Sequence, residues 1–144
     1  MKLTRAADYA IRGVIYMAMQ PAGAIVVIPE IAREMGIPVG FLARIFQSLS
    51  RAGVVISHRG KKGGYSLTRE PAFLTLKDII EAVEGNISLN ICLDGYSKCD
   101  RMAYCPTRVH LADIQRVLVE NLEKYDFATL AEEEKANRKA QGLS

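Results

Sequence analysis

Residues 29–53, PEIAREMGIPVGFLARIFQSLSRAG, decide how this chain folds. The stretch opens with a proline, which suits the first turn of a helix, and a glycine at position 36 ends that helix. After a short turn, apolar side chains recur at helical spacing up to a second glycine: Phe41, Leu42, Ile45, Phe46 and Leu49. Two helices joined by so short a turn form a helix-turn-helix, whose second helix enters the major groove of DNA.

A basic hairpin follows the second helix. Residues 54–56 (VVI) and 65–67 (YSL) have strand character, and RGKKGG lies between them. The glycines let the backbone approach phosphates closely, and an arginine can enter a narrow minor groove. An ordinary solvated hairpin also carries charges at its tip. Directly after a helix-turn-helix, however, the pattern predicts a DNA-binding wing.

Three further segments carry helical spacing. Residues 4–19 place an apolar face behind Thr4, a suitable N-cap, and residues 75–83 form a shorter helix that ends at Gly85. The apolar spacing over residues 106–130 predicts one long helix with an apolar stripe: Leu111, Ile114, Leu118, Leu122 and Tyr125. Such a helix spans about 37 Å, more than a small domain covers. The stripe therefore favours pairing with a second copy over packing on the chain's own core.

Together these elements predict a mainly α fold with a small β wing, a winged helix-turn-helix followed by a long C-terminal dimerisation helix. We expect the DNA-binding domain at 1–85, a cysteine loop at 86–106, the dimerisation helix at 107–131 and a flexible tail at 132–144. With 144 residues, 49% of them hydrophobic, the chain is long enough for one core.

The formal net charge of +3 is unevenly distributed. Residues 1–70 hold ten Lys and Arg against four acids, a balance of +6, whereas residues 71–144 hold nine against twelve, a balance of −3. Double-stranded DNA is therefore expected to bind the amino-terminal half, which leaves the acidic half for sensing and self-association.

All three cysteines, Cys92, Cys99 and Cys105, lie in one short polar loop. The gaps of six and five residues are too wide for a zinc knuckle with two-residue gaps or for a Cys-x-x-Cys redox pair. Thiolates are the usual ligands of iron–sulfur clusters, and a cysteine followed by proline occurs in bacterial ferredoxin ligand runs. The spacing therefore favours an iron–sulfur cluster that needs one further, non-cysteine ligand.

Two other interpretations of these cysteines stay open: small buried hydrophobes, and a disulfide pair with one thiol left over. The flanking residues are too polar for a core segment: Asp94, Gly95, Ser97, Lys98, Asp100 and Arg101. The sequence has no long apolar run and no signal-peptide pattern, so we expect a cytoplasmic protein without a membrane segment. Structural disulfides are disfavoured in that reducing compartment.

The sequence does not have the pattern of an enzyme. Neither His58 nor His110 has a nucleophile or acid partner at a useful spacing, and there is no phosphate-binding loop or His-Glu metal motif. We therefore expect no catalysis and no small-molecule substrate.

The chain resembles the IscR/NsrR-type family of bacterial winged helix-turn-helix transcription regulators over nearly its whole length. The resemblance rests on MKLT at 1–4, DYAIR at 8–12, IA at 31–32, GI at 36–37, RG at 59–60, GGY at 63–65 and the three cysteines. It implies an operator-binding homodimer in which Cys92, Cys99 and Cys105 hold a [4Fe-4S] or [2Fe-2S] cluster.

The resemblance also bears on the remaining cluster ligand. The IscR pattern places a histidine three residues after the last cysteine, but this chain has Arg108 there, which cannot ligate iron. The NsrR pattern implies Asp8, supplied by the partner subunit, and that is the ligand we expect. Asp8 would otherwise form a surface pair with Arg12 or Arg5. His110 is the reserve ligand.

Residues early in the second helix of the motif are placed to read bases: Gly40, Phe41, Ala43, Arg44 and Gln47. Arg44 is the expected principal reader, because arginine can bind guanine through two hydrogen bonds. Gly40 and Ala43 lack the polar groups of the matching IscR positions, so a different operator is expected. As in the family, Arg59 is expected to read the minor groove. The expected phosphate contacts are Arg51, Lys61 and Lys62.

The sequence thus predicts a DNA-binding transcription regulator, and more specifically a repressor, whose operator binding is controlled by an iron–sulfur cluster. The cluster would sense nitric oxide, redox state or iron status. The alternative is a metal-free regulator of the same fold that responds to thiol oxidation or to a protein partner.

Overall fold

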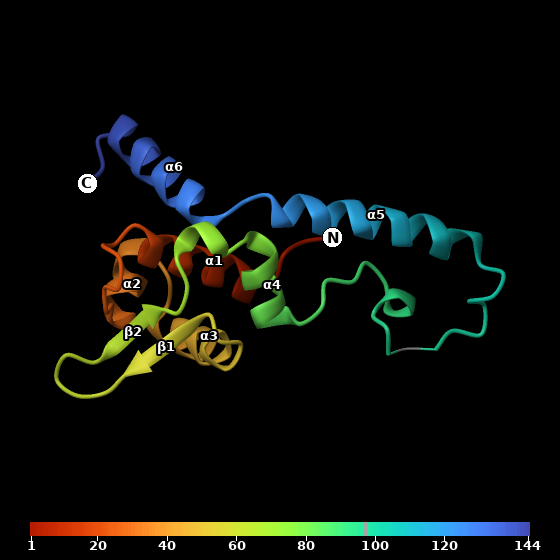
Figure 1. Cartoon of the computed structure of the whole chain (residues 1–144), viewed down its shortest axis with the longest axis horizontal. Helices are drawn as coiled ribbons and strands as arrows, with labels where there is room; N and C mark the ends of the chain where they lie inside the picture. The colour runs from red at the N-terminus through yellow and green to blue at the C-terminus, as the bar shows by residue number, and fades with distance from the viewer. Residues whose placement is uncertain (97) are drawn as a thin grey trace.

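A computed structural model describes residues 1–96 and 98–144; Ser97, a polar residue of the cysteine loop, lies outside the described residues. The described part is mainly helical with a two-stranded antiparallel sheet, as the sequence predicts (Figure 1). The elements are α1 (Arg5–Ala18), α2 (Ile28–Met35), α3 (Val39–Arg51), β1 (Val55–His58), β2 (Gly64–Leu67), η1 (Pro71–Phe73), α4 (Leu76–Glu84), η2 (Ile91–Leu93), α5 (Pro106–Glu123) and α6 (Phe127–Ala140).

The predicted helix-turn-helix and wing are confirmed. The first helix of the motif ends at Gly36, whose φ of 64° is left-handed, a conformation that glycine adopts at little cost. The two strands pair from Val55 opposite Leu67 to His58 opposite Gly64. Residue Val26 adds an isolated bridge to Tyr65, with both backbone hydrogen bonds at 2.8 Å. Strand β2 is therefore paired with β1 on one edge and bonded to the body through Val26 on the other.

One buried core joins α1, α2, α3 and the wing. Helix α1 approaches α3 closely at Gly13, where a Cβ would lie 3.0 Å from the Phe46 ring. The ring of Phe46 also packs edge-on against Tyr65 of β2, at 5.2 Å between ring centroids. Tyr16 of α1 donates a hydrogen bond to Glu30 of α2 at 2.5 Å. Burial and this bond raise the pKa of Tyr16 to about 12.

The single long helix predicted for 107–131 is wrong. Helix α5 ends at Glu123 and a new helix, α6, begins at Phe127. Between them the chain bonds to the start of α4: Leu76 N donates to Tyr125 O at 3.0 Å, and Phe127 N donates to Leu74 O at 2.9 Å. The side chain of Asp126 then caps α6 by accepting from Thr129 N at 2.9 Å. A capping signal therefore interrupts the apolar stripe.

The flexible tail predicted for 132–144 is also wrong over residues 132–140, which belong to α6. Helix α6 packs against α1 and η1, and it buries Phe127 and Ala131. Lys135 pairs with Glu132 on its exposed side. Arg138 pairs with Glu134 and also donates to Met35 Sδ of α2 at 3.1 Å. The polar residues that suggested disorder therefore belong partly to the solvent side of a docked helix and partly to its contact with α2.

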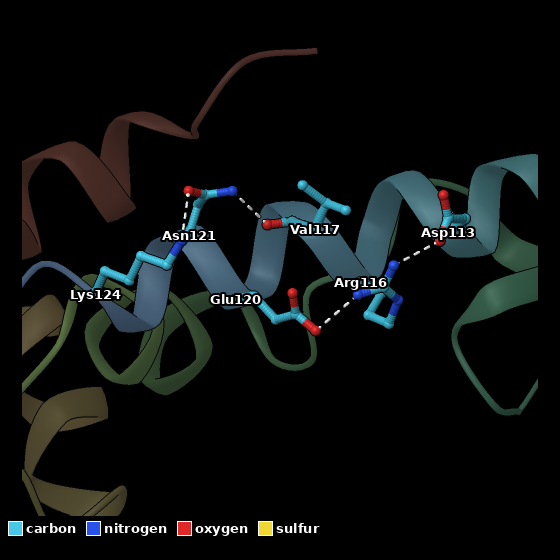
Figure 2. A network of polar contacts seen from close by, with 6 residues as sticks. All are labelled: Asp113, Arg116, Val117, Glu120, Asn121 and Lys124. Carbon is cyan, nitrogen blue, oxygen red and sulfur yellow. Dashed lines mark hydrogen bonds and ion pairs between the residues drawn. The ribbon is translucent and has the colours of Figure 1, made fainter.

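Helix α5 extends away from the body formed by α1 to α4, and it carries the cysteine loop at its far end (Figure 1). None of its eighteen residues, all of them described, is buried. Figure 2 shows a polar network along one of its faces, in which Arg116 pairs with Asp113 at 2.7 Å and with Glu120 at 2.9 Å. Among the described helices, none is long and apolar enough to cross a membrane.

Candidate DNA interface and cysteine loop

The outward face of α3 carries the predicted base-reading residues. Leu42, Ile45, Phe46 and Leu49 are buried. The remaining positions therefore point away from the core, and Gly40, Phe41, Arg44, Gln47 and Arg51 are exposed, with Ala43 half-buried. Arg51 is partly held in place, since its Nη2 donates to Ser48 Oγ at 3.1 Å. The structure thus brings the predicted residues of this helix to one accessible surface.

The wing places its cations at an exposed tip. Arg59, Lys61 and Lys62 are all exposed in the loop between the two strands. The loop closes through a bond from Gly63 N to Gly60 O at 2.9 Å, with Gly60 at a φ of 98°. In Figure 1 this loop and α3 lie along the same edge of the molecule, opposite α5 and α6. A duplex on that edge would meet both.

Asp8 lies on the first turn of α1. It forms an ion pair with Arg12, which the sequence offered as the alternative to a role in ligating the cluster. Its Oδ2 accepts from Arg12 Nη2 at 2.6 Å, and the two side chains are 48% and 43% exposed. Arg12 also lies over the ring of Tyr9, with its Cζ 5.5 Å from the ring centroid. That ring in turn packs edge-on against Phe41 of α3, at 6.2 Å between centroids.

Sequence reasoning missed Tyr9 as the contact between α1 and the recognition helix. Its ring lies between Arg12 and Phe41, two residues that are far apart in the sequence and were considered for separate roles. No spacing rule relates positions on two different helices, so this contact had no sequence signal.

The three cysteines are free thiols at different depths. Cys92 lies in η2 and is half-buried, Cys99 is exposed, and Cys105 is the half-buried residue that precedes α5. The interpretation as buried hydrophobes is therefore wrong for this fold, and the described chain contains no disulfide pair. Chemically, three free thiols on one loop suit a thiophilic metal centre or an oxidation sensor.

The thiols are not gathered around one point in the single chain. Within the described residues, no group of three or more His, Cys, Asp or Glu side chains lies close enough together to hold a metal ion. The three thiols thus fit an iron–sulfur cluster in their chemistry. To hold one, they would have to lie closer together, and the fourth ligand would have to come from outside this loop.

Arg108, the residue expected at the position of the IscR histidine, lies on α5 with a side-chain nitrogen that is not hydrogen-bonded. Its Nε atom is buried and has no hydrogen-bond partner among the described residues. A buried donor without a partner costs about 1–3 kcal/mol. The first turn of α5 therefore holds an unsatisfied hydrogen-bond donor of the kind that an anionic group can satisfy.

Comparison with known proteins identifies the family. The model of the Rrf2 family, described as an iron-dependent transcriptional regulator, matches residues 3–133. The chain belongs to the Rrf2 family. Its members are DNA-binding transcription regulators that act as dimers, and they are not enzymes.

Three solved Rrf2-type structures share this fold. CymR, the global cysteine regulator of B. subtilis, is 26% identical, with a TM-score of 0.72 over 92% of this chain and 97% of that chain. IscR of T. potens is 24% identical, with a TM-score of 0.74 over 94% and 90%. The oxidized form of CymR from Staphylococcus aureus is 23% identical, with a TM-score of 0.70 over 92% and 97%.

Proposed function

We propose that this Rrf2 regulator is a repressor that binds operator DNA as a homodimer, under the control of an iron–sulfur cluster held by Cys92, Cys99, Cys105 and the Asp8 of a second subunit. The observation that carries the proposal is the set of three free thiols on one loop, in a family described as iron-dependent. When bound, such a cluster supplies reactivity towards nitric oxide, oxidants or iron depletion.

The DNA-binding half of the proposal rests on α3 and the wing. Arg44 and Gln47 extend from the outward face of α3, where a guanidinium can bind guanine and an amide can bind adenine. Arg59 at the wing tip suits a narrow minor groove. Phosphate contacts from Arg51, Lys61 and Lys62 would make binding steeply dependent on salt.

Dimerisation rests on the apolar side of α5. Three apolar side chains on this side are between 38% and 54% exposed: Ile114, Val117 and Leu118. So many exposed apolar side chains on one helix indicate a surface that a partner covers. A second copy of α5 is the occupant that the family suggests, because Rrf2 regulators act as dimers. Val117→Glu should then shift the protein towards monomer in sedimentation equilibrium, whereas Arg116→Ala, on the opposite side of α5 from Ile114 and Leu118, should not.

The contacts of Asp8 suggest how a cluster could influence DNA binding. In the single chain Asp8 is held by Arg12, which lies over Tyr9, and Tyr9 packs against Phe41 on the DNA-facing helix. A surface ion pair of this kind contributes less than about 1 kcal/mol, so the Asp8 carboxylate can exchange Arg12 for iron at little cost in stability. Any such exchange is transmitted by direct contact to α3.

The second candidate, a metal-free thiol sensor, has its own support. The thiols are free and not gathered in the single chain, and the chain is 26% identical to a global cysteine regulator over nearly all of that protein. Exposed Cys99 is the thiol most open to oxidation.

Anaerobic purification from cells grown with ample iron tests the proposal against this alternative. A brown protein with charge-transfer absorption and bound iron and sulfide supports the cluster, and Cys92→Ala should abolish the colour. The absorption should bleach on addition of nitric oxide. A colourless protein with full iron supply, whose operator binding changes only on thiol oxidation, would favour the second candidate.

A further inference from the structure

Gly40 has no explanation inside the folded chain. Of the eleven glycines, all of them described, eight have a positive φ. Two others are tightly packed: a Cβ at Gly13 would meet the Phe46 ring at 3.0 Å, and one at Gly63 would meet His58 O at 2.5 Å. At Gly40 the backbone is helical and an added Cβ would meet nothing within 4 Å. Neither conformation nor packing requires glycine there.

Glycine is also a poor choice for the local structure. It is the second residue of α3, and alanine is the better helix former because it loses less backbone freedom on folding. The N-cap residue of this helix is Pro38, which makes no side-chain capping bond that would offset the loss. The chain therefore carries a less stable residue at a position where alanine would fit.

The surroundings of Gly40 indicate what needs the space. Ala43, one turn further along the outward face, also lacks a polar group, and Val39 beside it is 51% exposed. The first turn of α3 thus carries no polar side chain at positions 39, 40 and 43, next to the long side chain of Arg44. In the major groove of DNA, the only apolar group at the base edges is the C5 methyl of thymine.

We infer that Gly40 is a specificity-determining residue, which lets the backbone of the first turn of α3 lie directly against a thymine methyl beside the base pair that Arg44 reads. This inference rests on the proposed DNA-binding function and deepens it. It assigns an A·T pair to the operator at a position where no side chain forms a hydrogen bond. Alanine at position 40 would place its methyl group where the thymine methyl lies.

The test compares Gly40→Ala with the wild type on a duplex that the wild type selects from a randomised library. Thermal unfolding of Gly40→Ala should be unchanged or shifted upward, because the fold accepts a Cβ there. Affinity for the selected duplex should fall about tenfold, the cost of one methyl group forced into a fitted contact. Affinity for a scrambled duplex at the same salt should not change.

Replacing the contacted thymine with deoxyuridine removes its methyl and should restore most of the lost affinity of Gly40→Ala, while slightly weakening the wild type. Asn137→Ala on exposed α6 is the control, since it improves helix propensity far from the DNA face and should leave binding unchanged. If Gly40→Ala binds the selected duplex as tightly as the wild type does, the inference is overturned and the proposed function stands. The same holds if Gly40→Ala loses affinity and deoxyuridine at no position restores it. A wild type that selects no duplex overturns both.

Discussion

Replacing Asp8 separates its structural contribution from its proposed role as a cluster ligand. The ion pair with Arg12 is short, at 2.6 Å, but both side chains are nearly half exposed. A pair of this kind, four residues apart on a helix, contributes about 0.3–0.5 kcal/mol. The negative charge in the first turn of α1 adds about 0.3–1 kcal/mol through the helix dipole. Asp8→Ala should therefore cost no more than about 1.5 kcal/mol of folding stability.

In a protein of this size, each kcal/mol lowers the melting temperature by about 2–4 °C, so the expected shift is at most about 6 °C. The loss of a cluster ligand should be much larger in its own assay. Asp8→Ala should release iron to a chelator far faster than the wild type. The rate of release can be measured anaerobically from the decay of the charge-transfer absorption.

Arg12→Ala is the matched control for this experiment, because it removes the same ion pair and leaves the carboxylate in place. It should lower the melting temperature slightly and retain the cluster as the wild type does. If Asp8→Ala and Arg12→Ala lost iron at the same rate, Asp8 would be a structural residue only, and the assignment of the ligand would be refuted.

Three further predictions concern the DNA contacts and the fold. Arg59→Ala should weaken operator binding and relax sequence preference, whereas Lys62→Ala should weaken binding to all duplexes alike; equal, non-selective losses in titrations with matched and scrambled duplexes would contradict the assignment. Phe127→Ala should cost about 3–5 kcal/mol in urea unfolding, because this side chain is fully buried; a loss below about 1 kcal/mol would mean that α6 is not docked.

Hydrogen bonds from Thr129 hold the pKa of Asp126 in the folded protein below its ordinary value of 3.8. The ionised Asp126 cap therefore stabilises the folded protein fully above pH 3.8, and this contribution is lost as the pH falls through the lower pKa of the folded state. The melting temperature of Asp126→Asn should therefore approach that of the wild type in acid, and a constant difference would contradict the cap.

The first four helices and the wing were predictable because their signals are local. Thr4 is indeed the N-cap of α1, with its hydroxyl accepting from Ala7 N at 3.1 Å. Gly36 ends α2, and the apolar spacing of α3 matches the residues it buries. Each of these features depends on residues a few positions apart, which is the range that sequence patterns describe.

The carboxy-terminal third was mispredicted because a non-local contact decides it. The apolar stripe continues through Tyr125, but the helix ends before it, because Tyr125 and Phe127 form backbone bonds to Leu76 and Leu74 and Asp126 caps the next helix. Asp126 with Thr129 is a local capping signal that the predicted long helix runs across. The proposed cluster ligands are also brought together by non-local contacts, because the three cysteines belong to one subunit and Asp8 to the other.

The affinity of one operator duplex for cluster-loaded and cluster-free protein, measured anaerobically at one salt concentration, tests the central claim most directly. If the cluster controls DNA binding through Asp8 and α3, the two forms must differ in dissociation constant, and Asp8→Ala should reduce that difference. Identical dissociation constants for the loaded and cluster-free protein would contradict the account.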